Sequence, residues 1–312
     1  MADWGTGLSP AKLKGETVSK CRDLLVDSTG LCLASRNTDY VTAVINAIEP
    51  GPNTIIAHDV TASASSAALV NGTAVHGEDF DDTFEGGPIH TSAVMIPAML
   101  AAAEIYRLSS SQIILGIVAG TELFCRLALT LPKAIHTGGF HPTAILGSFA
   151  AAFGSTVASS SDRDTIINAL GITGSMASGI IEYLGDGSWT KRMHPGWAAQ
   201  SGLRACAMAK AGFIGPRLVF EGEHGVFKVF AGSITPRTEQ LFEDLGNLYH
   251  MDTISFKPYP CGTMVQPYID CARQIHEQGI DPNEIVSIDC ETAEGIVHRL
   301  WEPLPLKHHP PT

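Results

Sequence analysis

The sequence predicts a mainly α-helical protein, with a large all-helical bundle domain over residues 1–255 and the start of a smaller α/β domain over 256–312. Three observations carry this prediction. The 312 residues are 45% hydrophobic and only 17% charged, so the chain can bury a large core. Apolar residues recur at helical spacing through the first two-thirds of the chain. Two short segments typical of strands occur only after Leu248.

The helices of the bundle are predicted from their caps and their periodicity. Ser9 and Pro10 are typical of an N-cap and a first helical residue, and apolar residues follow at helical spacing from Val18 to Leu33. Short runs of Ala, Gly and Ser let helix axes approach closely, which is typical of a tightly packed helical core. Further helices are predicted over 40–48, 62–75, 92–107, 111–131, 142–158, 163–180 and 195–211.

The smaller domain is predicted from a change near Leu248, where helical periodicity gives way to strand-like segments. Strands are predicted over 253–257 and 284–290, with a helix over 263–278 between them. The tail over 303–312, rich in proline, is predicted to be a loop. Two strands and one helix are too few to form a stable domain by themselves.

Composition excludes several functional classes. The formal net charge of −12 argues against nucleic-acid and membrane partners, although an anionic small substrate is allowed because a cleft is governed by its local charges. The 7 cysteines are odd in number and form no CxxC pair, which favours a reducing compartment. Residues 1–15 lack the pattern of a secretory signal. The apolar stretch 113–131 contains Glu122 and Arg126, so it is predicted to be a core helix and not a membrane span. A cytoplasmic location is the expectation.

The densest polar cluster lies within 76–90, between an Ala-rich helix and the next predicted helix. Asp79 and Asp82 are three residues apart and could share a helical face, where a carboxylate can orient a histidine tautomer. For Asp81, helix capping is at least as good an interpretation as catalysis. His90 is interpreted as functional. Because no metal-ligand spacing such as HExxH occurs, we predict no metal site.

Two further clusters begin predicted helices. Gly138 and Gly139 precede His141 and a proline, at a helix start whose backbone N–H groups favour anions. The neighbouring His136 is interpreted as exposed. In the third cluster, Lys191, Arg192 and His194 open a helix.

Positive charges are disfavoured beside a helix N-terminus unless an anion binds there. The alternative interpretation of this third cluster is a solvated basic loop. Together the three clusters suit one kind of chemistry. Removing a proton next to a carboxylate creates a more negative species, which cations and hydrogen-bond donors stabilise. A neutral His or Lys then accepts the proton, and a second acid assists a leaving group.

The clusters resemble the MmgE/PrpD family, which includes 2-methylcitrate dehydratase, cis-aconitate decarboxylase and iminodisuccinate epimerase. The blocks that carry the resemblance are HGEDFDDTFEGGPIH, GGFHPTAILGSFAAA, TKRMHPGWAAQSG and FKPYPCGTMVQPYIDCA. It implies an all-helical domain with a smaller α/β lid, a homodimer and chemistry without a cofactor. The active-site residues that it implies are Asp79, Thr83, His90, His141, Lys191 and His194.

Two departures from the family pattern stand out. Gln266 occupies a position where several members carry a histidine. Members also continue well past this C-terminus, through most of the lid, so we expect a truncated chain with weak binding and little turnover. We expect its helical bundle to fold and to dimerise by itself.

The sequence therefore predicts a cofactor-independent lyase, dehydratase-like, acting on a small hydroxy-polycarboxylic acid. His141 or Lys191 is the expected base, His90 the proton donor, and Asp79 the residue that orients a histidine. Substrate binding is assigned to Thr83, Arg192, His194 and Gln266. The alternatives are a decarboxylase or epimerase of the same family, or a non-catalytic polycarboxylate-binding or dimerisation remnant. A metal-dependent hydrolase built on His76, Asp79 and His90 is a more distant alternative.

Overall fold

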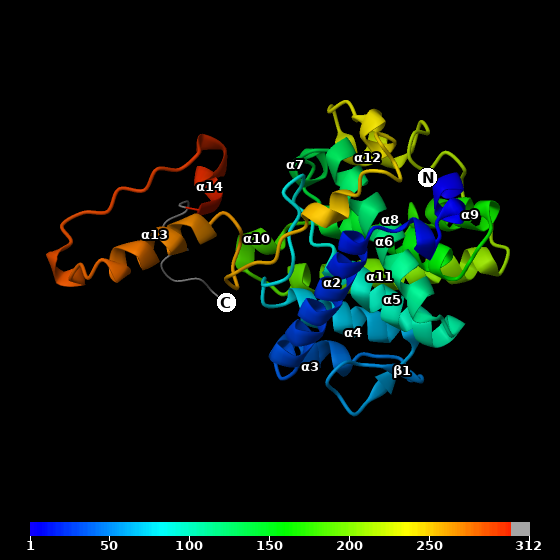
Figure 1. Cartoon of the computed structure of the whole chain (residues 1–312), viewed down its shortest axis with the longest axis horizontal. Coiled ribbons are helices and arrows are strands. Elements are labelled where there is room, and N and C mark those ends of the chain that lie inside the picture. The colour runs from blue at the N-terminus through cyan, green and yellow to red at the C-terminus, as the bar shows by residue number, and fades with distance from the viewer. Residues whose placement is uncertain (301–312) are drawn as a thin grey trace.

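The computed structural model describes residues 1–300 and is a helical bundle from which the last two helices project (Figure 1). A single two-stranded antiparallel sheet, β1 (Asn53–Thr54) and β2 (Thr61–Ala62), lies at its edge in the described part of the chain. The helices are α1 (Ala2–Gly7), α2 (Gly15–Ser35), α3 (Asp39–Ile45), α4 (Ala64–His76), α5 (Ser92–Tyr106), α6 (Ser110–Thr130), α7 (Ala134–Thr137), α8 (Pro142–Ala158), α9 (Arg163–Thr173), α10 (Tyr183–Asp186), α11 (Thr190–Lys210), α12 (Val226–Ala231), α13 (Gln266–Glu277) and α14 (Val297–Leu300).

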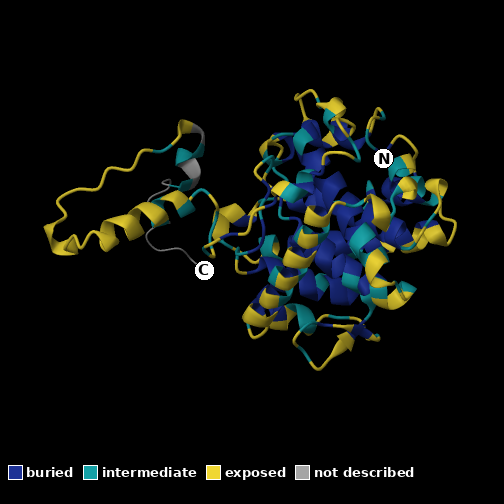
Figure 2. Ribbon diagram, in the orientation of Figure 1, coloured by how far each residue is buried: buried dark blue, intermediate teal, exposed yellow. Residues whose placement is uncertain are grey.

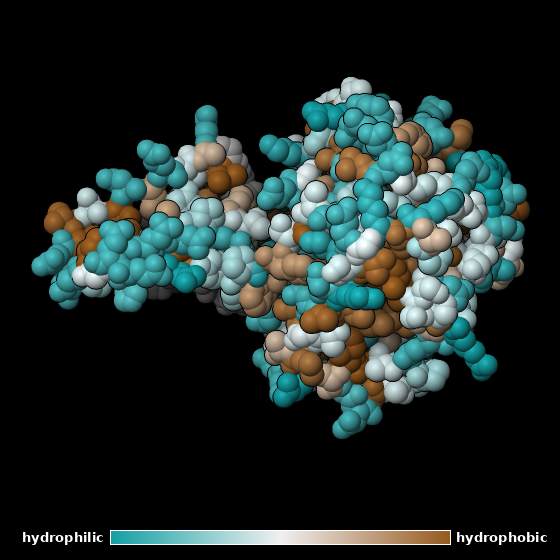
Figure 3. Space-filling view, viewed as in Figure 1, coloured by the Kyte–Doolittle hydropathy of each residue, from teal (hydrophilic) through white to brown (hydrophobic). Residues whose placement is uncertain are grey.

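Helix α8 is the centre of the bundle. All 17 of its residues are buried, and α5, α6, α9 and α11 pack around it. By contrast, no residue of α13 is buried, and Figure 2 shows exposed residues along most of the projecting part. In Figure 3 polar side chains cover most of that part, while apolar side chains gather on the face of the bundle turned to the viewer. The mainly α-helical prediction is confirmed.

Small residues let α4 and α11 lie nearly in backbone contact. A Cβ added at Gly72 of α4 would lie 2.5 Å from the Cα of Gly196 in α11, and one added at Gly196 would lie 2.2 Å from the carbonyl oxygen of Leu69. Because α4 ends at His76 and α11 begins at Thr190, this crossing brings the ends of the two helices together.

A buried ion pair fastens the segment after α12 to α6. Arg126 and Glu122 are both completely buried, with the Arg126 Nε donating to the Glu122 carboxylate at 2.8 Å. The guanidinium also donates to the backbone carbonyls of Gln240, Glu243 and Leu248. α6 is long and apolar enough to span a membrane by length and composition alone, but it is mostly buried. It is the core helix that the sequence predicts.

Both predicted strands are wrong. A 3-10 helix covers His250–Thr253, and Ser255 forms only an isolated bridge with Thr83. Residues 285–290 pair with no strand in the described chain, and Val286 is 98% exposed. Alternating side chains form a strand only where a neighbouring strand pairs with the backbone and covers one face, and this segment has neither.

Several helix bounds differ from those predicted, while α8 begins and ends where expected. The segment after Ser9 is a single 3-10 turn over Pro10–Lys12, and α2 starts at Gly15. The helix expected over 163–180 ends at Thr173, followed by Gly174. α11 starts five residues before the expected Pro195, because a proline inside a helix removes only its own N–H donor. The helix expected over 263–278 is confirmed as α13. The loop expected over 303–312 lies outside the described residues, and the boundary between 255 and 256 stays a prediction.

We expect Gly72→Ala to lower the free energy of unfolding by about 1–3 kcal/mol, because the new methyl group forces α4 away from α11. Gly30→Ala is the matched control. Gly30 lies inside α2 with nothing within 4 Å of an added Cβ, so we expect a gain of about 0.5–1 kcal/mol. Urea unfolding of the three proteins measures both changes. A Gly72→Ala variant as stable as the parent would contradict the close crossing.

Candidate active site

Four histidines form a continuous row at the point where α4, α8 and α11 meet. His76 is the last residue of α4, His90 lies just before α5, His141 precedes the first residue of α8, and His194 lies in the second turn of α11. The ring centroids are 4.9 Å apart between His90 and His76, and 5.7 Å apart between His76 and His141. They are 5.3 Å apart between His141 and His194. The row therefore joins the three sequence clusters.

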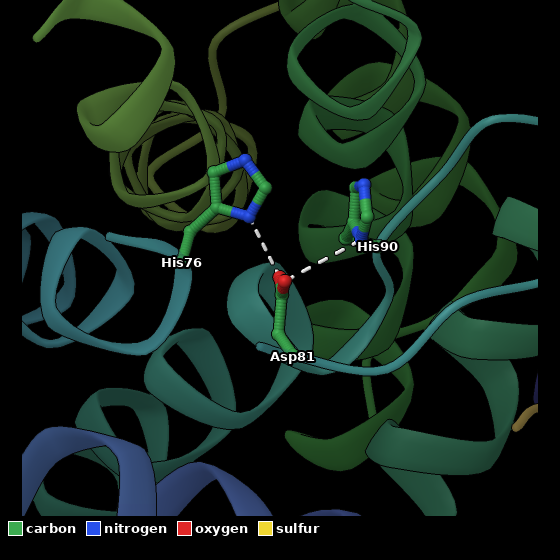
Figure 4. Close-up of side chains that lie close together, drawn as sticks. All are labelled: His76, Asp81 and His90. Atoms are coloured by element: carbon green, nitrogen blue, oxygen red, sulfur yellow. Dashed lines mark hydrogen bonds and ion pairs between the residues drawn. The ribbon is translucent and has the colours of Figure 1, made fainter. Parts of the chain in front are cut away.

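The carboxylate of Asp81 holds two of these histidines (Figure 4). Its Oδ2 accepts a hydrogen bond from Nδ1 of His76 at 2.7 Å, and its Oδ1 lies 3.5 Å from Nδ1 of His90. Asp81 is completely buried. Burial raises its pKa, while His90 and Lys257 oppose the rise. The histidines are thus oriented by Asp81 and not, as expected, by Asp79.

Asp82 fixes the loop that carries His90. Its carboxylate accepts hydrogen bonds from the backbone N–H and hydroxyl of Thr91 and from the backbone N–H of Ser92, the first residue of α5. Its backbone carbonyl lies 2.8 Å from Nδ1 of His90. The capping carboxylate is therefore Asp82. The expectation that Asp79 and Asp82 share a helical face is wrong, because α4 ends before both.

The contact with the Asp82 carbonyl also fixes the tautomer of His90. A carbonyl oxygen only accepts, so Nδ1 of His90 carries the proton and Nε2 is left as a base. Burial lowers the pKa of His90 to about 4, although Asp81 opposes this. His90 is consequently uncharged at neutral pH.

Asp79 is the counter-ion of two lysines. Its Oδ1 lies 2.7 Å from Nζ of Lys257 and 3.0 Å from Nζ of Lys191. The Lys257 ammonium also donates to the Asp79 backbone carbonyl at 2.8 Å, and only 1% of its side chain is exposed. Burial alone would raise the pKa of Asp79, but the two ammonium groups outweigh it and hold that pKa below the ordinary value.

The chain takes a left-handed turn to place this carboxylate. Asp79 has a φ of 52°, a conformation that aspartate and asparagine tolerate better than most residues. Lys257 reaches it because Thr83 and Ser255 form two backbone hydrogen bonds, of 2.9 and 3.0 Å. Thr83 therefore contributes to the site through its backbone.

His141 and His194 share one proton between their facing nitrogens. Their Nδ1 atoms are 3.1 Å apart, so one ring donates and the other accepts. Burial lowers the pKa of His141 well below its ordinary value, and that of His194 to about 4. Both rings are therefore neutral, and they adopt opposite tautomers.

Two predicted residues contact side chains or backbone outside the row of histidines. The guanidinium of Arg192 stacks on the ring of Tyr40, 4.7 Å from its centroid. Gln266 begins α13, where its amide donates to the backbone carbonyl of Tyr259 at 3.3 Å. The substrate contact expected of Gln266 stays a prediction.

The lyase site predicted from the sequence did not include three residues of the cluster, His76, Asp81 and Lys257. The first two lie in the polar cluster within 76–90. Lys257 lies in the FKPYPCG block, and its only sequence signal is that block. Its contact with Asp79 spans 178 residues and has no local signature.

One set of side chains has the composition of a metal site. Ligand atoms of His76, Asp81 and His90 lie within 4.8 Å of one another. However, the Nδ1 atoms that face Asp81 carry the protons of the hydrogen bonds described above, and Nζ of Lys257 lies 3.7 Å from Asp81 Oδ1. Protonated nitrogens do not bind metals, and an adjacent ammonium opposes a cation. The set fits a hydrogen-bonded anchor better than a metal centre.

A separate hollow of about 390 Å³ lies between α9 and α12. Among its lining residues, His224 is the one with an ionisable side chain. It therefore offers little for acid–base chemistry, and the histidine–lysine cluster is the candidate active site.

Comparison with known proteins identifies the family that this chain resembles. The family model named MmgE/PrpD N-terminal domain matches residues 1–239. The cis-aconitate decarboxylase-like protein oryM of Aspergillus oryzae is 26% identical over 84% of this chain and 58% of its own length. The cis-aconitate decarboxylase of Aspergillus terreus is 25% identical over 88% and 59%, and that of Homo sapiens 23% over 91% and 60%. The chain thus spans about six-tenths of the length of these curated relatives.

We expect Asp79→Asn to lower the free energy of unfolding by roughly 2–4 kcal/mol, because it leaves the buried Lys257 ammonium without its nearest counter-charge. Asparagine tolerates the left-handed turn, so the change reports on charge and not on backbone strain. Lys191→Met is the matched control. Its side chain is 28% exposed, and Asp79 keeps Lys257, so we expect a smaller loss. Urea unfolding at neutral pH measures both. Equal losses would mean that the Lys257 pair is not the stronger contact.

The row of neutral histidines also predicts a steep acid transition. The pKa of His90 and of His194 is lowered from 6.5 to about 4. As the pH falls through 6.5 the unfolded chain binds protons that the folded protein does not, so stability is lost between pH 6.5 and about 4. Each of the two histidines contributes on the order of 3 kcal/mol. Asp27 acts in the opposite direction over this range, because burial raises its pKa to about 6 and the folded protein binds that proton first. Urea midpoints of the parent and of His90→Asn across this range isolate the histidine contribution. Equal losses of stability towards acid would contradict the neutral row.

Proposed function

The chain belongs to the MmgE/PrpD family, and on that premise we propose that it is a lyase acting on a small polycarboxylic acid. The observation that carries the proposal is the meeting of two ammonium groups and a row of neutral imidazoles around Asp79 and Asp81. Cations and bases held together in this way suit proton removal next to a carboxylate.

The lysines hold the substrate carboxylates. Lys191 is the more accessible, with 28% of its side chain exposed, and Asp79 neutralises it in the resting protein. A substrate carboxylate beside Lys191 and Lys257 gains the same attraction that now stabilises Asp79. As negative charge develops on the substrate during proton removal, the two ammonium groups stabilise it further.

A neutral histidine takes the proton. His90 exposes an unprotonated Nε2, and His141 is fixed by His194, so we propose that either ring can act as the base. Lys191, already ion-paired, is better suited to hold a carboxylate. The imidazolium that forms is the acid for the next step, which reconciles the expected donor role of His90 with its neutral resting state.

In the dehydratase reaction the base removes a proton from the carbon next to a carboxylate, and the neighbouring C–O bond breaks. The hydroxyl takes the proton from the imidazolium and leaves as water. No electron carrier is needed for this balance. The decarboxylase alternative breaks the C–C bond to a carboxylate, which leaves as CO2, and the remaining carbon takes a proton that a histidine relays from water. It is favoured by the names of the relatives, which are decarboxylases.

Assembly and location remain part of the proposal. A homodimer would cover part of the apolar bundle face in Figure 3. α2 also carries two exposed apolar side chains that an interface could bury, Val26 at 73% and Leu33 at 47%. A cytoplasmic location is consistent with free cysteines throughout the described chain.

The purified chain tests the proposal in deuterated water. We expect citrate or cis-aconitate to raise its thermal stability slightly and to undergo slow deuterium exchange or conversion, which proton NMR detects. His141→Asn should slow the reaction by roughly a hundredfold or more, while His224→Asn, an exposed histidine outside the cluster, should not. Binding without exchange or conversion would overturn the lyase assignment in favour of a binding remnant. If the chain neither binds nor converts these acids, both the lyase assignment and the binding-remnant alternative are overturned.

A further inference from the structure

His76 carries a buried nitrogen that its protein environment does not satisfy. Its side chain is fully buried, and its Nδ1 donates to Asp81 at 2.7 Å. Burial lowers the pKa of His76 well below its ordinary value, and Lys191 adds to this. A neutral ring with the proton on Nδ1 leaves Nε2 as a pure acceptor. Within the described chain, that Nε2 has no hydrogen-bond partner.

The neighbouring donors are directed to other partners. The His141 ring stacks on His76 with an interplanar angle of 30°, so it presents its face and not an N–H group. His90 directs its only N–H to the Asp82 carbonyl. The ammonium groups of Lys191 and Lys257 point to Asp79.

The orientation of the ring places this acceptor on the same side as the base of His90. Figure 4 shows one nitrogen of each ring directed to Asp81 and the other directed away from it. The two rings are adjacent, with centroids 4.9 Å apart, and one is buried while the other is partly exposed. A group bound against His90 would also adjoin His76.

The chemistry of the acceptor selects the group that binds it. Carboxylates offer only acceptors, so they leave Nε2 of His76 unsatisfied. A hydroxyl group donates one hydrogen bond and satisfies it, and a buried acceptor left without a donor costs binding energy. We propose that His76 is a specificity-determining residue whose Nε2 accepts a hydrogen bond from the hydroxyl of a hydroxy-polycarboxylic acid. This rests on the proposed function, and it favours the hydroxy acid over an acid that lacks the hydroxyl.

Two ligands that differ by this hydroxyl test the proposal without measuring turnover. Citrate and propane-1,2,3-tricarboxylate carry the same three carboxylates, and only citrate has the hydroxyl. By calorimetry we expect the full chain to bind citrate roughly fivefold more tightly, the ratio that one net hydrogen bond gives. His76→Asn keeps an amide N–H for Asp81 but has no acceptor in the Nε2 position, so the ratio should fall to about one. His224→Asn should keep the parent ratio.

The outcomes separate this proposal from the proposed function. If the parent binds neither acid, the proposed function fails and this inference fails with it. If the parent binds both acids equally, or if His76→Asn keeps the parent ratio or weakens both acids equally, only the assignment of His76 fails. Should His76→Asn not fold, nitrogen NMR of the parent decides. The Nε2 resonance of His76 should move on addition of citrate and stay in place on addition of the deoxy acid, and the reverse would overturn the inference.

Discussion

A carboxylate that is completely removed from water, that of Asp81, constrains the whole site. A buried charge is tolerated only where neighbouring groups compensate it. Here His76 donates to one oxygen, while His90 and Lys257 approach the other. Each partner comes from a different segment, so the end of α4, the loop before α5 and the segment after His250–Thr253 must all meet at this carboxylate.

The position of α11 relative to α4 sets the other half of the site. Gly72 and Gly196 allow the two helices to cross with almost no side chains between them. A wider crossing would separate His76 from His141 and His194, and it would withdraw Lys191 from Asp79. The small residues of the bundle therefore have a consequence beyond core packing, because they set the distances between the histidines and the lysines. The geometry of the site thus depends on helix packing as much as on the chemistry of its side chains.

Much of the bundle could be predicted because its signals are local. α8 has a proline at its start and contains only apolar and small uncharged residues, and its bounds follow directly from the sequence. The polar clusters were also recognisable, since each interrupts an apolar chain at a helix end.

What could not be predicted was the pairing within these clusters. Asp79, Asp81 and Asp82 look alike in sequence, yet one binds lysines, one binds histidines and one caps a helix, depending on a left-handed turn at Asp79. Lys257 joins the site through contacts across 178 residues, and the segment over 284–290 alternates like a strand but has no partner to pair with.

The arrangement separates the two tasks of the proposed chemistry in space. The lysines and Asp79 form a charged side, where a substrate carboxylate can replace the Asp79 carboxylate beside the lysines with little change in net charge. The histidines form an uncharged side, where a neutral ring can accept a proton from the substrate without first losing one of its own. Dehydration and decarboxylation would use the same lysines and histidines, but dehydration removes a proton first and decarboxylation adds one after CO2 leaves. They differ in whether the substrate offers a hydroxyl to the neutral side, and in this chain that side ends in an acceptor, Nε2 of His76, which only a hydrogen-bond donor can satisfy. The uncharged side formed by the histidines, more than the lysines, is therefore the part of the site that can distinguish one polycarboxylic acid from another.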